Sequence, residues 1–152
     1  MKYTFLFTFL TIAVYFSCTN PKSESNADSA TDENKSVLFI CSSVDTVNGH
    51  KNGTFLSEIA VPFILLEEAG YKIDIVSPKG GEIPIYYKFD TTEVILRALQ
   101  STYYQVQTTH SFQPEQLDPQ AYHVVILPGG YGQFWDIHQN KSIQQIIAQI
   151  YE

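Results

Sequence analysis

A glycine-rich turn that follows an apolar run is the part of this sequence most suited to binding a ligand. Residues 124–127 are apolar and mostly β-branched, which predicts a buried strand. Pro128 ends that strand because it has no N–H to donate to a neighbouring strand. Gly129, Gly130 and Gly132 then allow a sharp turn that leaves backbone amides uncovered. Because ligands bind at the carboxyl ends of parallel strands, this turn is either a binding site or only a tight connection.

The cysteines and histidines give weaker signals of chemistry. Cys41 ends an apolar run, which is typical of a small buried residue. The only other cysteine is Cys18, in the N-terminal signal-like segment. If Cys18 is lipidated, Cys41 has no partner, so we expect no disulfide framework. The four histidines have no metal-ligand spacing, which favours surface or packing roles. We therefore expect neither a metal ion nor a cofactor.

Three apolar runs and two amphipathic segments would position the turn. Strands are predicted at residues 37–41, 72–77 and 124–127, each rich in apolar residues. Helices are predicted at 54–69 and 141–151, where apolar residues recur at helical spacing. The isoleucine face of the last helix favours a core role over a partner surface. This order of elements predicts an α/β fold, with a parallel sheet and flanking helices.

The segments between these elements are less regular. Residues 42–53 predict a polar loop that contains two Asn-Gly turn signals. Residues 92–99 predict a short helix, whereas 101–109 have a β-type composition that favours a small hairpin or strand. Residues 113–120 contain two prolines and predict a loop.

The bulk composition fits one globular domain. The chain has 152 residues, of which 44% are hydrophobic, enough for a packed core. Its formal net charge of −7 argues against nucleic acid as a partner, because nucleic-acid binding requires a basic face.

The N-terminal part predicts an export signal followed by a tether. Residues 1–18 carry one lysine, an apolar stretch and a Ser-Cys pair, which resembles a bacterial lipoprotein signal. Cys18 would then be lipidated and would attach the protein to the membrane of the cell envelope. The alternatives are an uncleaved anchor, or plain secretion with a secreted or periplasmic location. Residues 19–35 are polar and predict a disordered tether, so residues 36–152 would form the folded part.

Three motifs in the folded part carry a family resemblance. Residues 52–63 read Asn-Gly-Thr-Phe-Leu-Ser-Glu-Ile-Ala-Val-Pro-Phe, residues 76–81 read Val-Ser-Pro-Lys-Gly-Gly, and residues 127–132 read Leu-Pro-Gly-Gly-Tyr-Gly, with Trp135-Asp136 after them. In this order they resemble the ThiJ/PfpI superfamily, and most closely its stress chaperones with glyoxalase III or deglycase activity. The resemblance implies a flavodoxin-like fold, shared with class I glutamine amidotransferases.

The resemblance also implies a mechanism and site residues. In this family the nucleophile is a cysteine on a strained elbow, within a motif resembling Ala-Val-Cys-His-Gly. A glutamate from the first helix lies against that cysteine, and Glu58 matches it. The Gly-Gly turn offers amides as an oxyanion hole, and Gly129 and Gly130 match it. Glu58 is thus the catalytic candidate, against the simpler interpretation of a solvent-facing helix carboxylate.

The sequence departs from the family pattern at the nucleophile. It has no Cys-His-Gly, and Cys41 ends a different strand without a neighbouring histidine. Tyr131 also stands where that branch often has histidine. An activated thiolate needs both the thiol and its neighbours. We therefore expect a C-terminally incomplete, truncated domain, with no covalent catalysis by this chain alone.

Three hypotheses follow for the function. The first is an interrupted reading frame whose full-length relatives act on small reactive aldehydes. The second is a noncatalytic binding or holdase module on the cell envelope. The third is that the sequence is a piece of an intact enzyme. In a truncated chain, a strand missing beside residues 124–127 would leave an apolar edge, which predicts poor stability or self-association.

Overall fold

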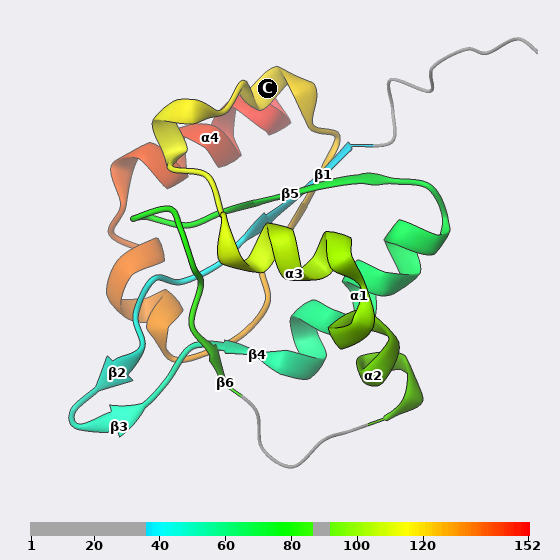
Figure 1. Ribbon diagram of the computed structural model, residues 1–152. Helices are drawn as coiled ribbons and strands as arrows, with labels where there is room; N and C mark the ends of the chain where they lie inside the picture. Colours follow the sequence, from blue (N-terminus) through cyan, green and yellow to red (C-terminus); the bar gives the residue numbers. More distant parts are fainter. Residues whose placement is uncertain (1–35, 87–91) are drawn as a thin grey trace, which may run out of the picture.

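The computed structural model describes residues 36–86 and 92–152. The signal and tether predicted for residues 1–35, with the lipidation site Cys18, lie outside the described residues. Within the described ranges the elements run from strand to helix to strand and end in a helix, as Figure 1 shows.

A three-stranded parallel sheet forms the centre of the fold (Figure 1). Its strands are β1 (Ser36–Ile40), β5 (Lys72–Val76) and β7 (Val124–Ile126), in the order β5-β1-β7. β1 pairs in parallel with both neighbours, so it has no free edge. The three predicted strands are therefore confirmed to within one residue at each end.

Helices cover both faces of this sheet. On one face lie α1 (Leu56–Glu68), α2 (Glu93–Gln100) and α3 (Thr102–Thr109), whose buried residues share one apolar cluster. On the other face lies α4 (Lys141–Tyr151), whose isoleucines belong to a second cluster. The predicted α/β fold with a parallel sheet and flanking helices is confirmed, and so is the core role of the last helix.

β1 is buried because it contributes side chains to both clusters. Successive side chains of a strand point to opposite faces. Phe39 therefore packs with Phe63 of α1, while Leu38 packs in the cluster that contains Ile143 of α4. Each such fully buried side chain contributes roughly 1.5–3 kcal/mol of transfer free energy. This double burial explains why the strand is apolar throughout its length.

The predicted loop 42–53 contains a small hairpin. β2 (Thr46–Val47) pairs with antiparallel β3 (His50–Lys51), and Asn48-Gly49 forms the turn with positive φ at both residues. The Asn-Gly signal fits this geometry, because hairpin turns of this kind require positive φ. A second pair, parallel, joins β4 (Thr54–Phe55) to β6 (Ile85–Tyr86).

The β-type prediction for residues 101–109 is wrong, because the segment folds as helix α3. Ser101 caps the helix, accepting a hydrogen bond of 3.1 Å at its Oγ from the Tyr104 amide. The rings of Tyr103 and Tyr104 lie 5.4 and 5.1 Å from the ring of Phe63. Local β propensity is therefore overridden by the cap and by tertiary packing.

The remaining boundaries differ only in detail. The helix predicted at 54–69 begins at Leu56, because Thr54 and Phe55 form β4 instead. The predicted helix at 92–99 is confirmed as α2, which is shifted by one residue. The predicted loop 113–120 holds two short 3-10 turns, at Pro114–Gln116 and Pro119–Ala121.

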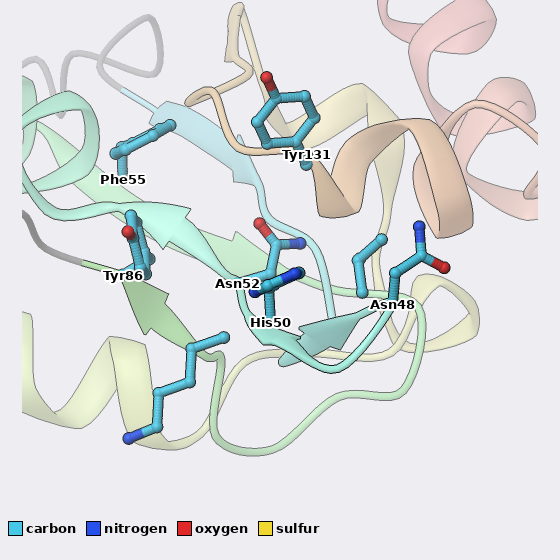
Figure 2. Close-up of a pocket in the computed structure, with 8 residues that line it drawn as sticks. Asn48, His50, Asn52, Phe55, Tyr86 and Tyr131 are labelled. Atoms are coloured by element: carbon cyan, nitrogen blue, oxygen red, sulfur yellow. The ribbon is translucent and has the colours of Figure 1, made fainter.

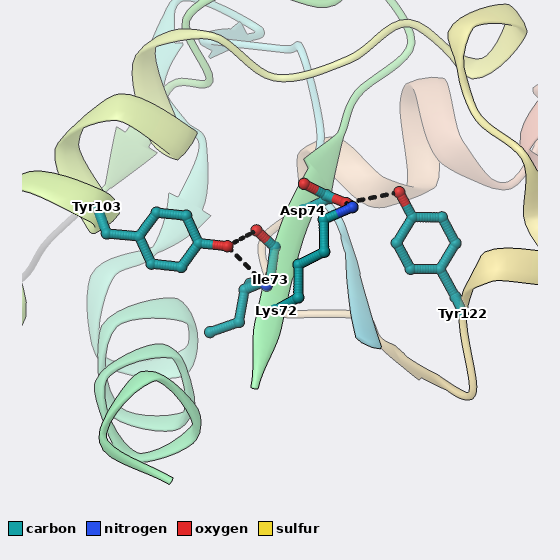
Figure 3. Close-up of polar contacts among 5 residues, drawn as sticks. All are labelled: Lys72, Ile73, Asp74, Tyr103 and Tyr122. Carbon is teal, nitrogen blue, oxygen red and sulfur yellow. Dashed lines mark hydrogen bonds and ion pairs between the residues drawn. The ribbon is translucent and has the colours of Figure 1, made fainter. Parts of the chain in front are cut away.

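The outer edge of β5 is covered by a side-chain contact from Tyr103, which Figure 3 shows, and by a loop contact. The Tyr103 hydroxyl donates to the Ile73 carbonyl at 2.5 Å and accepts from the Ile73 amide at 2.7 Å. Burial raises the pKa of Tyr103, which keeps this hydroxyl protonated. Further along, the Phe112 amide donates to the Ile75 carbonyl at 2.8 Å. These contacts satisfy backbone groups that an open edge would leave unpaired.

A buried carboxylate ties β5 to the segment before β7 (Figure 3). Asp74 accepts a hydrogen bond of 2.8 Å from the Tyr122 hydroxyl, and Lys72 Nζ lies 2.9 Å from the same oxygen. Burial, followed by the bond to Asp74, raises the pKa of Tyr122. The carboxylate is therefore paired, as a buried charge must be.

The outer edge of β7 has no comparable cover. Among the described residues β7 pairs with β1 alone. The side chains of Val124 and Leu127 are 43% and 49% exposed. The two edges of the sheet are thus unequal, one covered and one open.

The two neighbouring tyrosines of α3 provide a matched test of this edge cover. The Tyr103→Phe variant should lose about 1–3 kcal/mol of unfolding free energy, because it leaves Ile73 backbone groups without a partner. The Tyr104 hydroxyl is buried without a partner among the described residues, so Tyr104→Phe should be neutral or stabilising. Urea denaturation of both variants measures the difference, and equal losses would contradict the assignment.

Candidate functional site

The structure brings the predicted site residues together. Glu58 lies in the first turn of α1, and Gly129 and Gly130 lie in the turn after β7. The Gly129 amide donates a hydrogen bond of 2.6 Å to Glu58 Oε2. Residues that are 71 positions apart in sequence therefore meet at the carboxyl end of the sheet. This is the edge at which open α/β sheets bind ligands.

Close neighbours favour glycine at these two positions, a side-chain carboxylate at Gly129 and a backbone carbonyl at Gly130. A Cβ at Gly129 would lie 2.5 Å from Glu58 Oε2. A Cβ at Gly130 would lie 2.2 Å from the carbonyl oxygen of Gly53, and the φ of Gly130 is +140°. The Phe55 amide also donates to the Gly129 carbonyl at 3.0 Å. The turn is thus held against the start of α1 by contacts that leave no room for a side chain.

The backbone amides of Gly129 and Gly130 differ in whether they already donate a hydrogen bond. The Gly129 amide is engaged by the Glu58 carboxylate, whereas the Gly130 amide donates no hydrogen bond within the described residues. The Gly130 amide can donate to a developing oxyanion, whereas the neighbouring Glu58 carboxylate opposes a second negative charge there. The site therefore contains the two features that the sequence suggested, an amide turn and an acid.

The sequence analysis did not predict the residues whose hydrogen bonds hold this turn in place. The Gln133 side chain donates to the Pro128 carbonyl, and the Gln133 amide donates to the Gly130 carbonyl at 3.2 Å. Asp136 Oδ2 accepts a hydrogen bond of 2.6 Å from the Ser43 amide, which joins the end of β1 to the helical turn Gln133–Ile137. The Trp-Asp pair after the turn was the only sequence signal for these contacts.

Cys41 is a core residue, as the sequence predicted. It belongs to the cluster beneath α1 and has no exposed surface. Burial raises the pKa of its thiol to about 12, so the thiol stays protonated at neutral pH. Because the thiolate is the nucleophile, this cysteine cannot act as one in the folded state.

A cavity lies beside the turn (Figure 2). Its volume is about 500 Å³, and it is bounded by the β2–β3 hairpin, by β4 and β6, and by Tyr131 of the glycine-rich turn. Phe55 and Tyr86 provide aromatic surface, and His50 and Asn52 provide polar groups. Sequence reasoning missed this cavity, because its walls come from segments that lack any shared pattern.

The described residues contain neither a metal-binding cluster nor a helix that could span a membrane. No group of three or more His, Cys, Asp or Glu side chains in residues 36–86 and 92–152 is placed to hold a metal ion. Over the same ranges, no helix has the length and apolar character needed to cross a membrane. All four histidines of the chain are exposed.

Comparison with known proteins rests on solved structures. The chain matches no family model, and no curated protein matches its sequence. The 24-kDa rapid encystment protein of Francisella tularensis aligns with a TM-score of 0.66 and 29% identity, over 77% of this chain and 54% of that protein. Glyoxalase III from Candida albicans aligns with a TM-score of 0.61 and 24% identity, over 76% and 52% respectively.

These matches support the fold and the superfamily resemblance. The chain shares the flavodoxin-like arrangement of both structures, with a parallel sheet between helices. It spans about half the length of the solved structures that it matches. The likeness to glyoxalase III, at 24% identity, is a likeness of fold.

Three glycine variants test the close approach at the turn. Gly130→Ala should cost roughly 3 kcal/mol of unfolding free energy, because a backbone carbonyl cannot move aside. Gly129→Ala should cost roughly 1–2 kcal/mol, because the Glu58 side chain can rotate away. Gly49, with φ +78° and no atom within 4 Å of an added Cβ, is the matched control and should cost only about 1 kcal/mol as Gly49→Ala. Denaturant titration measures all three, and equal costs would contradict the crowding at Gly130.

Proposed function

We propose that this chain is a ThiJ/PfpI-type domain that carries one side of a cysteine-dependent site of the glyoxalase III or deglycase kind, and that it is inactive on its own. The contact of 2.6 Å between the Gly129 amide and Glu58 Oε2 is the observation that carries the proposal. It supports the proposal because the acid and the amide turn named by the resemblance lie against each other.

The nucleophilic side of such a site would have to come from outside these 152 residues. The sequence contains no Cys-His-Gly motif, and Cys41 is buried with a thiol pKa raised to about 12. A carboxylate and an amide without a thiolate can bind a polarised carbonyl but cannot form a covalent adduct with it. The substrate class proposed for the complete site is a small reactive aldehyde, by analogy with glyoxalase III.

Methylglyoxal consumption tests this proposal. The full chain should consume methylglyoxal no faster than buffer, and Glu58→Gln should give the same rate, because neither protein has an activated thiolate. Glyoxalase III from Candida albicans, assayed in parallel, is the positive control. Methylglyoxal turnover by the chain that is lost in Glu58→Gln would overturn the proposal that the chain is inactive on its own.

The open edge of β7 supports a further part of the proposal, that the chain self-associates. Five large apolar side chains between residues 124 and 135 are exposed, namely Val124, Leu127, Tyr131, Phe134 and Trp135. An uncovered strand edge with apolar neighbours is a site for pairing with another strand. A second copy of the chain provides the same edge, so the pairing can be symmetric.

Sedimentation velocity of matched lysine variants tests the association. Leu127→Lys should shift the full chain toward monomer, because it places a charge beside the open edge. Leu65→Lys is the control, since Leu65 is 51% exposed but lies on α1. A wild-type chain that is a single monomeric species, or equal effects of the two lysines, would contradict the proposal.

The same exposed side chains favour the second candidate function, a noncatalytic binding or holdase module. In that case the wild-type chain would be monomeric, and Leu127→Lys would weaken its suppression of the aggregation of a heated client protein. For location, we propose lipid anchoring at Cys18 in the cell envelope, supported by the sequence pattern alone. Mass spectrometry of the mature N-terminus would reject it by finding an unmodified Cys18.

A further inference from the structure

We propose that the cavity between the β2–β3 hairpin and Tyr131 binds a planar aromatic ring that carries a carboxylate. This inference goes beyond the proposed function. It involves no covalent step, and Glu58 is not among the residues that line the cavity. The volume of about 500 Å³ lies in the range of small-molecule sites.

The aromatic walls of the cavity favour a flat ring. The rings of Phe55 and Tyr86 lie 5.5 Å apart with an interplanar angle of 75°, an edge-to-face pair. Figure 2 shows these two rings on one side of the cavity and Tyr131 on another. A planar ring placed between them can stack on one aromatic face and meet the edge of another. A branched aliphatic ligand would use the same surface less well.

The charges around the cavity favour an anion. Lys51 and His50 line it, and none of the lining residues within the described ranges 36–86 and 92–152 is acidic. In a chain of net charge −7, a lysine beside an aromatic cavity favours an anionic ligand over a cationic one. Aromatic walls alone would also suit a quaternary ammonium ion. The Lys51 ammonium disfavours that alternative and attracts a carboxylate instead.

The asparagine amides supply hydrogen-bonding groups for the polar end of the ligand. Asn48 and Asn52 both line the cavity. Asn52 Nδ2 is buried and has no hydrogen-bond partner among the described residues. Because this nitrogen is enclosed by protein atoms, the exposed Asn48 amide is the donor that a ligand oxygen in the cavity can reach. A carboxylate accepts from amide and ammonium donors together.

Binding of three probes to the full chain tests the proposal. Benzoate, neutral benzamide and cationic benzyltrimethylammonium share the phenyl ring but differ in charge. In ligand-observed NMR titrations benzoate should bind about tenfold more tightly than benzamide, and the cation should bind most weakly. Equal affinities for benzoate and benzamide, or tightest binding of the cation, would overturn the choice of ligand. No binding of any probe would overturn the site.

Variants of exposed side chains locate the binding without disturbing the core. Lys51→Gln should weaken benzoate about threefold to fivefold and leave benzamide unchanged. Tyr131→Ala should weaken both, whereas Tyr151→Ala, which removes an equally exposed ring on α4, should weaken neither. Because binding of these probes requires no covalent step, this site can fail or stand independently of the proposed function. Equal effects of Tyr131→Ala and Tyr151→Ala would contradict the assignment.

Discussion

The approach of the glycine-rich turn to the first turn of α1 is the constraint on which the site depends. It brings a backbone amide within 2.6 Å of the Glu58 carboxylate, and it leaves no space for a Cβ at Gly129 or Gly130. The approach also explains why β4 begins where a helix was expected. The Phe55 amide is needed as a donor to the Gly129 carbonyl, so the chain stays extended there before α1 starts.

The sheet fixes the position of the glycine-rich turn relative to α1. β1 is buried between two apolar clusters, and β7 runs beside it in fixed register, so the turn after β7 leaves the sheet at a defined point. α1 packs on the same β1 side chains, which fixes where Glu58 can lie. The cavity beside the turn depends on the same frame, because Phe55 and Tyr131 flank the contact between the two segments.

Much of the fold could be predicted because its signals are local. The apolar strands and the isoleucine face of α4 follow from burial on both faces or on one. α3 could not be predicted, since its helix depends on the cap by Ser101 and on packing against Phe63. The glycine-rich turn could be predicted from the strand and the proline before it, whereas Glu58 was found only through a family resemblance. The contacts of Gln133 were not predicted because hydrogen bonds within an irregular turn leave no periodic pattern, and the cavity was not predicted because its walls come from distant segments.

Amide hydrogen exchange at Gly129 tests the contact at the centre of this structure most directly. The Gly129 amide should exchange about tenfold faster in Glu58→Ala than in the wild type, with Glu58→Gln in between, because the acceptor is removed or loses its charge. The Phe112 amide, which donates to Ile75 far from Glu58 in sequence, should keep its rate in all three proteins. An unchanged Gly129 rate in Glu58→Ala would show that the carboxylate and the turn are not in contact.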